Sequence, residues 1–235
     1  MSTPTRTEPI PRTGTRAGEI RDQLHDAIVD RRLTPGTKLV EDEIGATFSA
    51  SRTVVRAALQ ALAFDGIVTL EPNRGASVSK PSPEVARQVF DARRMIEPGL
   101  ALAAAARITA ADVAMLEQHL ATEAEAIAAR GPSARRAEIH ASGELHLSIA
   151  AIAGNEILSR FLRELVARSS LVIALYGRSG ASSCARDEHG RIVAALASGN
   201  GRAAAELMRH HIDHIEADLD YQPAGEASIR DLLKL

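Results

Sequence analysis

Three histidines in the second half of the chain are suited to bind a metal ion. His146, His189 and His211 each lie in a different segment of helical pattern. Imidazole nitrogens are good ligands for a borderline ion such as Zn²⁺, and helices packed side by side can bring such side chains together. The alternative for each is a solvated or core histidine without a ligand. His210 and His214, four residues apart on the last predicted helix, form a second possible metal pair, which would leave His189 unexplained.

A second group of residues has the spacing of a DNA-reading helix. Ser51 can cap a helix, because its hydroxyl can accept a backbone N–H left unpaired at the helix start. Arg52 and Arg56 follow four residues apart and therefore share one face. Apolar residues recur at helical spacing on another face: Val55, Leu59 and Leu62. A short helix with a buried stripe and two arginines near its start is typical of a recognition helix, which inserts that end into the major groove.

The individual contacts of this helix follow from side-chain geometry. The guanidinium of Arg56 can bind guanine O6 and N7 together, so Arg56 is the candidate for a base contact. Ser51, Arg52 and Thr53 lie at the helix start and can hold phosphate as readily as bases. The alternative is that both arginines are ordinary solvated helix residues.

The elements around this helix predict a winged helix-turn-helix. Helices are expected over residues 18–31 and 41–47, and Gly66 ends the recognition helix where a left-handed residue is needed. Short strands are expected over residues 67–70 and 76–78. The turn between them would form the wing tip, with three candidate DNA-binding residues: Asn73, Arg74 and Gly75. Arg74 could enter the minor groove, and Gly75 would let the backbone approach DNA; the alternative is a mere exposed turn.

This order of motifs resembles the DNA-binding domain of GntR-family transcription regulators. The resemblance spans nearly seventy residues and rests on segments 32–39, 41–44, 51–53, 55–56, 66–68 and 72–76, with Leu59 and Leu62. Three residues depart from the family pattern: Asp42, Val54 and Ala57. These departures concern the operator sequence that is read rather than the fold.

The composition limits the class of protein. The chain has 235 residues, 45% hydrophobic and 25% charged, with a formal net charge of -2. This balance argues against a protein that coats nucleic acid but allows a site-specific binder with a local basic cluster. Cys184 is the only cysteine, which allows no intramolecular disulfide and suits a reducing compartment. No segment resembles a signal peptide or membrane span, so we expect a cytoplasmic protein without a membrane partner.

The second half of the chain is predicted to be a helical bundle. Two prolines within residues 79–83 indicate a linker, and six helical segments with short connections follow, which is typical of an antiparallel bundle. The predicted fold is therefore mainly α: an N-terminal winged helix-turn-helix and a C-terminal all-α bundle. The expected division is a disordered arm (1–12), a DNA-binding domain (13–80), a helical effector-binding and dimerisation domain (81–221) and a C-terminal tail (222–235).

Residues 84–217 resemble the C-terminal domain of the FCD subfamily of FadR-like regulators. The spacing from His189 to His211 is the strongest element of this resemblance. It implies that His146, His189 and His211 bind a divalent metal, most simply Zn²⁺, at the floor of an effector cavity. The family's aspartate ligand, four residues before the first histidine, is Ser142 here. Three imidazoles completed by water or by the effector's carboxylate could still hold the metal, and Ser142 would then face the effector.

Arg93 has two interpretations. It lies four residues before Glu97, which predicts an intrahelical ion pair. The family resemblance instead points Arg93 into the cavity, where its guanidinium would pair with an effector carboxylate.

The expected function is that of a ligand-responsive transcription regulator, a repressor, that is not an enzyme. It would bind a palindromic double-stranded operator as a homodimer, because two winged helices related by a two-fold axis read successive turns of the groove. A small carboxylate metabolite would be the effector. One alternative is a metal-dependent hydrolase or lyase that uses the three histidines, but it leaves the first eighty residues without a purpose. Another is a regulator that senses the metal itself.

Overall fold

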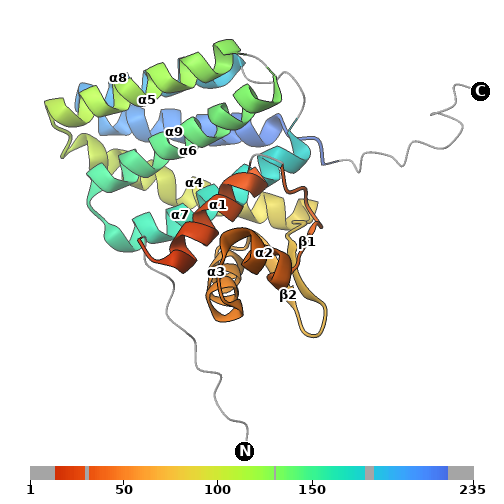
Figure 1. The fold of residues 1–235 in the computed structure, drawn as a ribbon. Coiled ribbons are helices and arrows are strands. Elements are labelled where there is room, and N and C mark those ends of the chain that lie inside the picture. The colour runs from red at the N-terminus through yellow and green to blue at the C-terminus, as the bar shows by residue number, and fades with distance from the viewer. Residues whose placement is uncertain (1–13, 30–31, 130, 178–182, 222–235) are drawn as a thin grey trace, which may run out of the picture.

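The computed structural model describes residues 14–29, 32–129, 131–177 and 183–221 (Figure 1). Within these ranges it has nine helices and one small three-stranded sheet. The predicted fold class, a winged helix-turn-helix followed by a helical bundle, is confirmed. The predicted arm (1–12) and tail (222–235) lie outside the described residues. None of the helices in the described ranges is both long and apolar enough to cross a membrane.

The N-terminal part is a three-helix unit with a β-hairpin wing. Its helices are α1 (Arg16–Val29), α2 (Glu41–Phe48) and α3 (Arg52–Phe64). Its strands are β1 (Lys38–Leu39), β2 (Val68–Glu71) and β3 (Gly75–Val78), in the order β1-β3-β2 and all antiparallel. The hairpin was predicted, whereas β1 was not, because two residues are too few to show an alternating pattern.

Helix α3 forms as its sequence predicts. The Ser51 hydroxyl accepts from the backbone N–H of Val54 at 3.4 Å and so caps the helix. The predicted apolar stripe is buried in the core of this part: Val55, Leu59 and Leu62. Gly66 has φ +74° and lies against the Arg168 guanidinium, so a Cβ here would be strained and only 2.6 Å from that group.

Six helices form the C-terminal bundle: α4 (Pro83–Ala105), α5 (Ala110–Ala129), α6 (Pro132–Ala153), α7 (Glu156–Tyr176), α8 (Ser183–Ala197) and α9 (Gly201–Ala217). Helix α4 continues through Pro98. A capping box starts α5, because Thr109 and Asp112 exchange hydrogen bonds of 2.9 and 3.2 Å between side chain and backbone. Buried residues from all six helices share one apolar core.

Helix α7 joins the two parts of the molecule. Leu171 is 1% exposed and belongs to the apolar core of the N-terminal part. Arg168 donates to the Phe64 carbonyl at 3.4 Å, and the Tyr176 hydroxyl donates to the Pro81 carbonyl at 2.7 Å. In Figure 1, α1 lies across α7 beside the bundle. The N-terminal part, which we call the DNA-reading unit after its predicted role, is therefore packed directly on the bundle as well as tethered to it.

Candidate metal centre and nucleic-acid interface

The fold brings the three predicted histidines together in the middle of the bundle. His146 comes from α6, His189 from α8 and His211 from α9, and their exposed fractions are 2%, 0% and 1%. The Nε2 atom of His211 lies 3.2 Å from that of His146 and 2.9 Å from that of His189. In the described residues this is the one group of three or more potential ligands placed closely enough to share a metal ion.

Each histidine has a carboxylate behind it. Nδ1 of His146 is hydrogen-bonded to Glu97. Nδ1 of His189 is 2.8 Å from Oε2 of Glu123. Nδ1 of His211 is 2.9 Å from Oε2 of Glu188. An ionised carboxylate only accepts hydrogen bonds, so this network assigns the proton of each neutral ring to Nδ1 and leaves the Nε2 lone pair free.

The protonation states agree with this assignment. Burial lowers the pKa of His211 to about 3, although its hydrogen bond to Glu188 opposes the shift. Burial also lowers the pKa of His146, against the opposing effect of Glu97. The neutral form of both rings is therefore favoured at pH 7.

Three lone pairs directed at one point are chemically suited to a cation. Without a cation, the Nε2 atoms, 2.9 and 3.2 Å apart, would place electron-rich nitrogens next to one another with no proton between them. Ligand nitrogens around a tetrahedral Zn²⁺ lie about 3.3 Å apart, given Zn–N distances of about 2.0–2.1 Å. The three imidazoles thus fit a zinc-like ion, with the nitrogens already close to ligand spacing.

Arg93 lies behind this cluster rather than in a cavity. It is 3% exposed, forms the predicted ion pair with Glu97 and donates from Nη1 to the Ser169 hydroxyl at 3.0 Å. Burial would raise the pKa of Glu97, but Arg93 and His146 outweigh it and hold that pKa well below its usual range. In this arrangement Glu97 and Ser169 bind the Arg93 guanidinium, and its pairing with an effector carboxylate stays a prediction.

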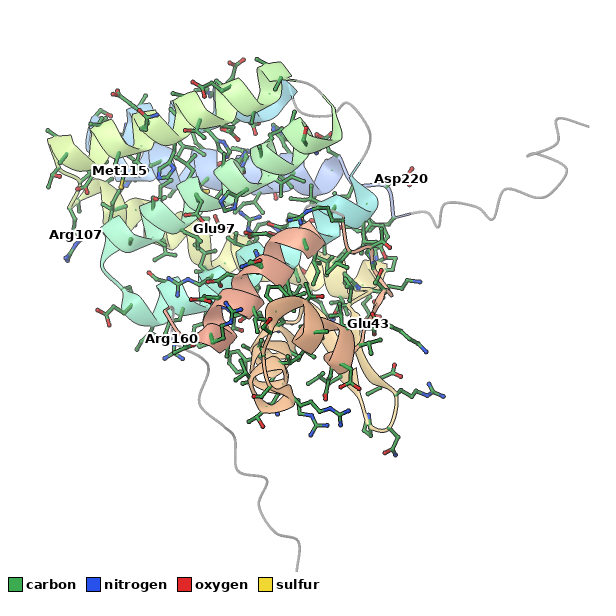
Figure 2. All side chains as sticks on the ribbon, viewed as in Figure 1. Glu43, Glu97, Arg107, Met115, Arg160 and Asp220 are labelled. Atoms are coloured by element: carbon green, nitrogen blue, oxygen red, sulfur yellow. The ribbon has the colours of Figure 1, made fainter. Side chains whose placement is uncertain are left out.

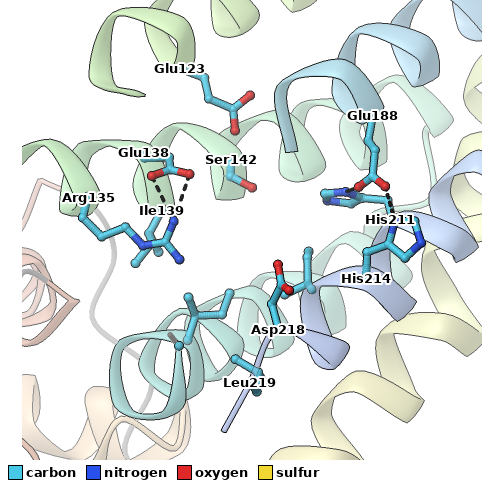
Figure 3. Close-up of a pocket in the computed structure, with 13 residues that line it drawn as sticks. Glu123, Arg135, Glu138, Ile139, Ser142, Glu188, His211, His214, Asp218 and Leu219 are labelled. Carbon is cyan, nitrogen blue, oxygen red and sulfur yellow. Dashed lines mark hydrogen bonds and ion pairs between the residues drawn. The ribbon is translucent and has the colours of Figure 1, made fainter. Parts of the chain in front are cut away.

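A small cavity opens beside His211 (Figure 3). Ser142 lies on its wall, on the α6 turn before His146, and Glu123 reaches into it from α5. Further polar side chains line it: Arg135, Glu138, Glu188, His214 and Asp218. Arg135 donates from Nη1 to both carboxylate oxygens of Glu138 at 3.0 Å. Among the described residues that line it, the cavity therefore has more acidic than basic groups.

The second predicted metal pair does not form. His210 bonds to Glu206 at 3.0 Å and is largely exposed, and His214 bonds to Glu188. Hydrogen bonds from His211 and His214 outweigh burial and lower the pKa of Glu188 to about 2. These two histidines are surface residues next to the cluster.

The carboxylates behind the histidines are the functional residues that sequence reasoning missed. In the sequence, Glu97 was noticed only as a partner of Arg93. Glu123 carried no local signal, because its partner His189 is 66 residues away. Only the packing of α5 against α8 reveals it.

The predicted DNA-binding residues lie on α3 and the hairpin, which both project away from the bundle (Figure 1). Arg52 donates to both carboxylate oxygens of Asp42 at 2.8 and 2.9 Å. Arg56 donates from Nε to Glu41 at 2.8 and 2.9 Å. The arginine side chains remain 69% and 63% exposed. Two acidic residues of α2 therefore orient the two arginines while leaving them open to a partner; Thr53 is also exposed.

The wing tip has the geometry of a tight turn. Asn73 has φ +63° and Gly75 φ +84°, and open space surrounds the position of a Cβ on Gly75. The Arg74 side chain is 82% exposed, with Glu71 3.5 Å away. The tip thus presents backbone and one cation to solvent.

Comparison with known proteins agrees across the chain. The family model "Bacterial regulatory proteins, gntR family" matches residues 16–78, and the model "FCD domain" matches residues 88–214. The HTH-type transcriptional regulator LutR of Bacillus subtilis is 28% identical over 80% of this chain and 94% of its own. The Uxu operon transcriptional regulator of Escherichia coli is 27% identical over 86% and 85%. A solved structure, a putative transcriptional regulator GntR from Rhodococcus sp. RHA1, matches with TM-score 0.74 and 26% identity over 86% of this chain and 96% of that one.

Proposed function

The chain belongs to the GntR family of bacterial regulatory proteins and carries an FCD domain, and from this premise we propose that it is a metal-containing, ligand-responsive repressor. Its family and relatives are DNA-binding transcription regulators, so the chain is not an enzyme. The proposed protein is a homodimer that binds a palindromic operator and responds to a small carboxylate metabolite.

The convergence of the three Nε2 atoms carries this proposal. His146, His189 and His211 would hold a divalent ion, with Zn²⁺ favoured because neutral imidazoles are its usual nitrogen ligands. Ser142 supplies a hydroxyl in place of the family's aspartate and is a weaker ligand. A bound ion would supply positive charge at the cavity, which attracts a carboxylate, and Ser142 could donate to that same group.

The proposed DNA contacts are those of a winged helix. Arg56 would exchange Glu41 for a guanine edge, while Ser51, Arg52 and Thr53 would hold phosphate at the start of α3. The wing residues Asn73, Arg74 and Gly75 would reach the minor groove. The exposure of both α3 arginines supports these roles.

An exposed apolar stripe on α4 supports the homodimer. Val85, Met95 and Leu102 are 41%, 84% and 49% exposed. With the small residues Ala92 and Gly99 between them, they follow steps of seven, three, four and three residues, which keep one helix face in line. Phe161 of α7, 53% exposed, lines a groove together with Val85. Such a grouping is typical of a protein interface. Met95→Lys should give a monomer by light scattering, whereas Met115→Lys on α5 should not.

Helix α7 offers the route by which the cavity could influence DNA binding. The contacts run from His146 through Glu97 and Arg93 to Ser169 on α7. Leu171, two residues further along α7, lies in the core of the DNA-reading unit. A shift of α7 would therefore move that unit relative to its dimer partner, in addition to any effect through the 79–83 linker. Coupling of this kind is reciprocal, so operator DNA must change effector affinity by the same factor.

The proposal is tested by selecting fragments of genomic DNA bound by the purified protein. We expect a short palindrome whose half-sites lie on one face of the duplex, bound by two chains. The metal-loaded protein should release it on addition of a carboxylate metabolite. Binding without any sequence preference, or by a single chain, would contradict the proposed mode of action.

A further inference from the structure

The cavity beside the histidines contains an acceptor that the protein leaves unused. Glu123 is 2% exposed, and its Oε2 atom accepts from His189. Its other oxygen, Oε1, is the one buried side-chain N or O atom in the described ranges that has no hydrogen-bond partner. A buried carboxylate oxygen without a donor is costly, since it has lost water without replacement.

The same cavity holds a second carboxylate without a donor. No residue in the described ranges donates to the side chain of Asp218, which directly follows α9. In Figure 3 Glu123 and Asp218 reach into the cavity from opposite sides, with Ser142 between them. The other acidic groups are already matched, because Arg135 binds Glu138 and two histidines bind Glu188. Among the described residues of the wall, Arg135 carries the only guanidinium and is thus engaged, and the unmatched groups are all acceptors.

This arrangement selects the charge of the ligand. Suppose that one carboxylate of the ligand lies at the three histidines. A second carboxylate on the ligand would lie against Glu123 or Asp218 and be repelled. An ammonium there would instead offer three N–H donors to carboxylate oxygens that accept no hydrogen bond from the described residues. The cavity has a volume of about 80 Å³, which suits a small ligand.

We propose that the effector is a small amino acid or similar zwitterion, whose carboxylate lies beside the three histidines and whose ammonium donates to Glu123 Oε1 and Asp218. The inference rests on the proposed function, because it places the carboxylate at the metal. It narrows the ligand class from carboxylates in general to those that carry a protonated amine.

Matched probes test the proposal on the zinc-loaded full-length chain by calorimetric titration. Glycine, β-alanine and 4-aminobutyrate are compared with the monocarboxylates and the dicarboxylates of the same spacing. The best amino acid should bind at least about tenfold more tightly than its monocarboxylate, and the dicarboxylate should bind most weakly.

Glu123→Gln provides the sharpest variant. The amide oxygen can still accept from His189, while the amide NH₂ replaces the free acceptor by a donor. The amino acid should lose about tenfold in affinity and the dicarboxylate should gain. Asp218→Asn, at a side chain without a hydrogen bond to any histidine in the described ranges, should shift selectivity in the same direction. Glu125→Gln, an exposed position on the same helix with the same charge change, should leave selectivity unchanged.

Three results would overturn the inference: no amino acid bound at millimolar concentration, equal affinity for amino acid and monocarboxylate, or unchanged selectivity in both cavity variants. Metal content measured on the same samples separates this failure from failure of the proposed function. A chain without metal would contradict the proposed function, whereas a metal-loaded chain that binds monocarboxylates without preference would contradict only the zwitterion.

Discussion

Carboxylates hold arginine or histidine side chains in two regions of the molecule, and the two regions differ in solvent exposure. On the DNA-reading face, Arg52 pairs with Asp42 and Arg56 with Glu41, with arginine side chains that are 69% and 63% exposed. In the bundle, Arg93, Glu97 and His146 form a network in which every side chain is at most 3% exposed. Figure 2 shows Glu97 among the helices, while Glu43 lies on the outside of the winged unit.

Solvent exposure determines how easily each set of ion pairs can be broken. An exposed ion pair contributes about 0–1 kcal/mol to stability. Its arginine can therefore exchange the carboxylate partner for a phosphate or a base at little cost. A buried pair is costly to break, because the remaining charge has neither water nor partner. The surface pairs therefore suit exchange with DNA, and the buried network suits fixed ligand geometry.

The largest expected effect comes from breaking the buried network. Arg93→Met fills similar space but leaves Glu97 with only His146 as a partner, and it should lower the free energy of unfolding by about 3–5 kcal/mol. Denaturant unfolding monitored by circular dichroism measures this loss. Loss of less than 1 kcal/mol, as in a solvated pair, would remove the distinction between the two regions.

A smaller effect is expected at the recognition helix, and in binding rather than stability. Arg56→Ala should weaken operator binding by about 1–3 kcal/mol and relax specificity at one base position in each half-site. Fluorescence anisotropy on operator and scrambled DNA tests this. An equal loss on both DNAs would show a phosphate contact instead, while the unfolding free energy should stay within about 1 kcal/mol.

The smallest effect is expected from the carboxylate beside Arg52. Asp42→Asn removes an exposed ion pair, so stability should change by less than about 1 kcal/mol. DNA affinity should rise and its salt dependence steepen, because one negative charge near the phosphates is lost and Arg52 is released. Unchanged affinity at low salt would mean that Arg52 is not near DNA.

Local rules predicted much of the fold. The Ser51 cap, the reversal at Gly66 and the capping box of Thr109 and Asp112 each depend on a few neighbouring residues, and all three are present. The two-residue strand β1 was not predicted, because its pairing with β3 joins residues nearly forty positions apart. A proline inside a helix usually kinks or breaks it, yet α4 continues through Pro98 as one element.

The clustering of the three candidate ligands could be predicted from the sequence, whereas their surroundings could not. The three histidines were found by their helical positions and the family spacing. The bond from Glu123 to His189 and the place of Arg93 behind Glu97 depend on how separate helices pack, which no local pattern encodes. The family resemblance placed Arg93 in the cavity, whereas the neighbouring Glu97 and Ser169 hold it away.

Metal content of the purified chain tests the central claim most directly. Mass spectrometry of wild type, His189→Ala and Ser142→Asp should find about one divalent ion per chain in wild type and in Ser142→Asp, and none in His189→Ala. The His189→Ala protein should remain folded and bind operator DNA in the absence of effector. Metal in Ser142→Asp alone would contradict the claim, because three imidazoles without a carboxylate would then be insufficient to hold the ion.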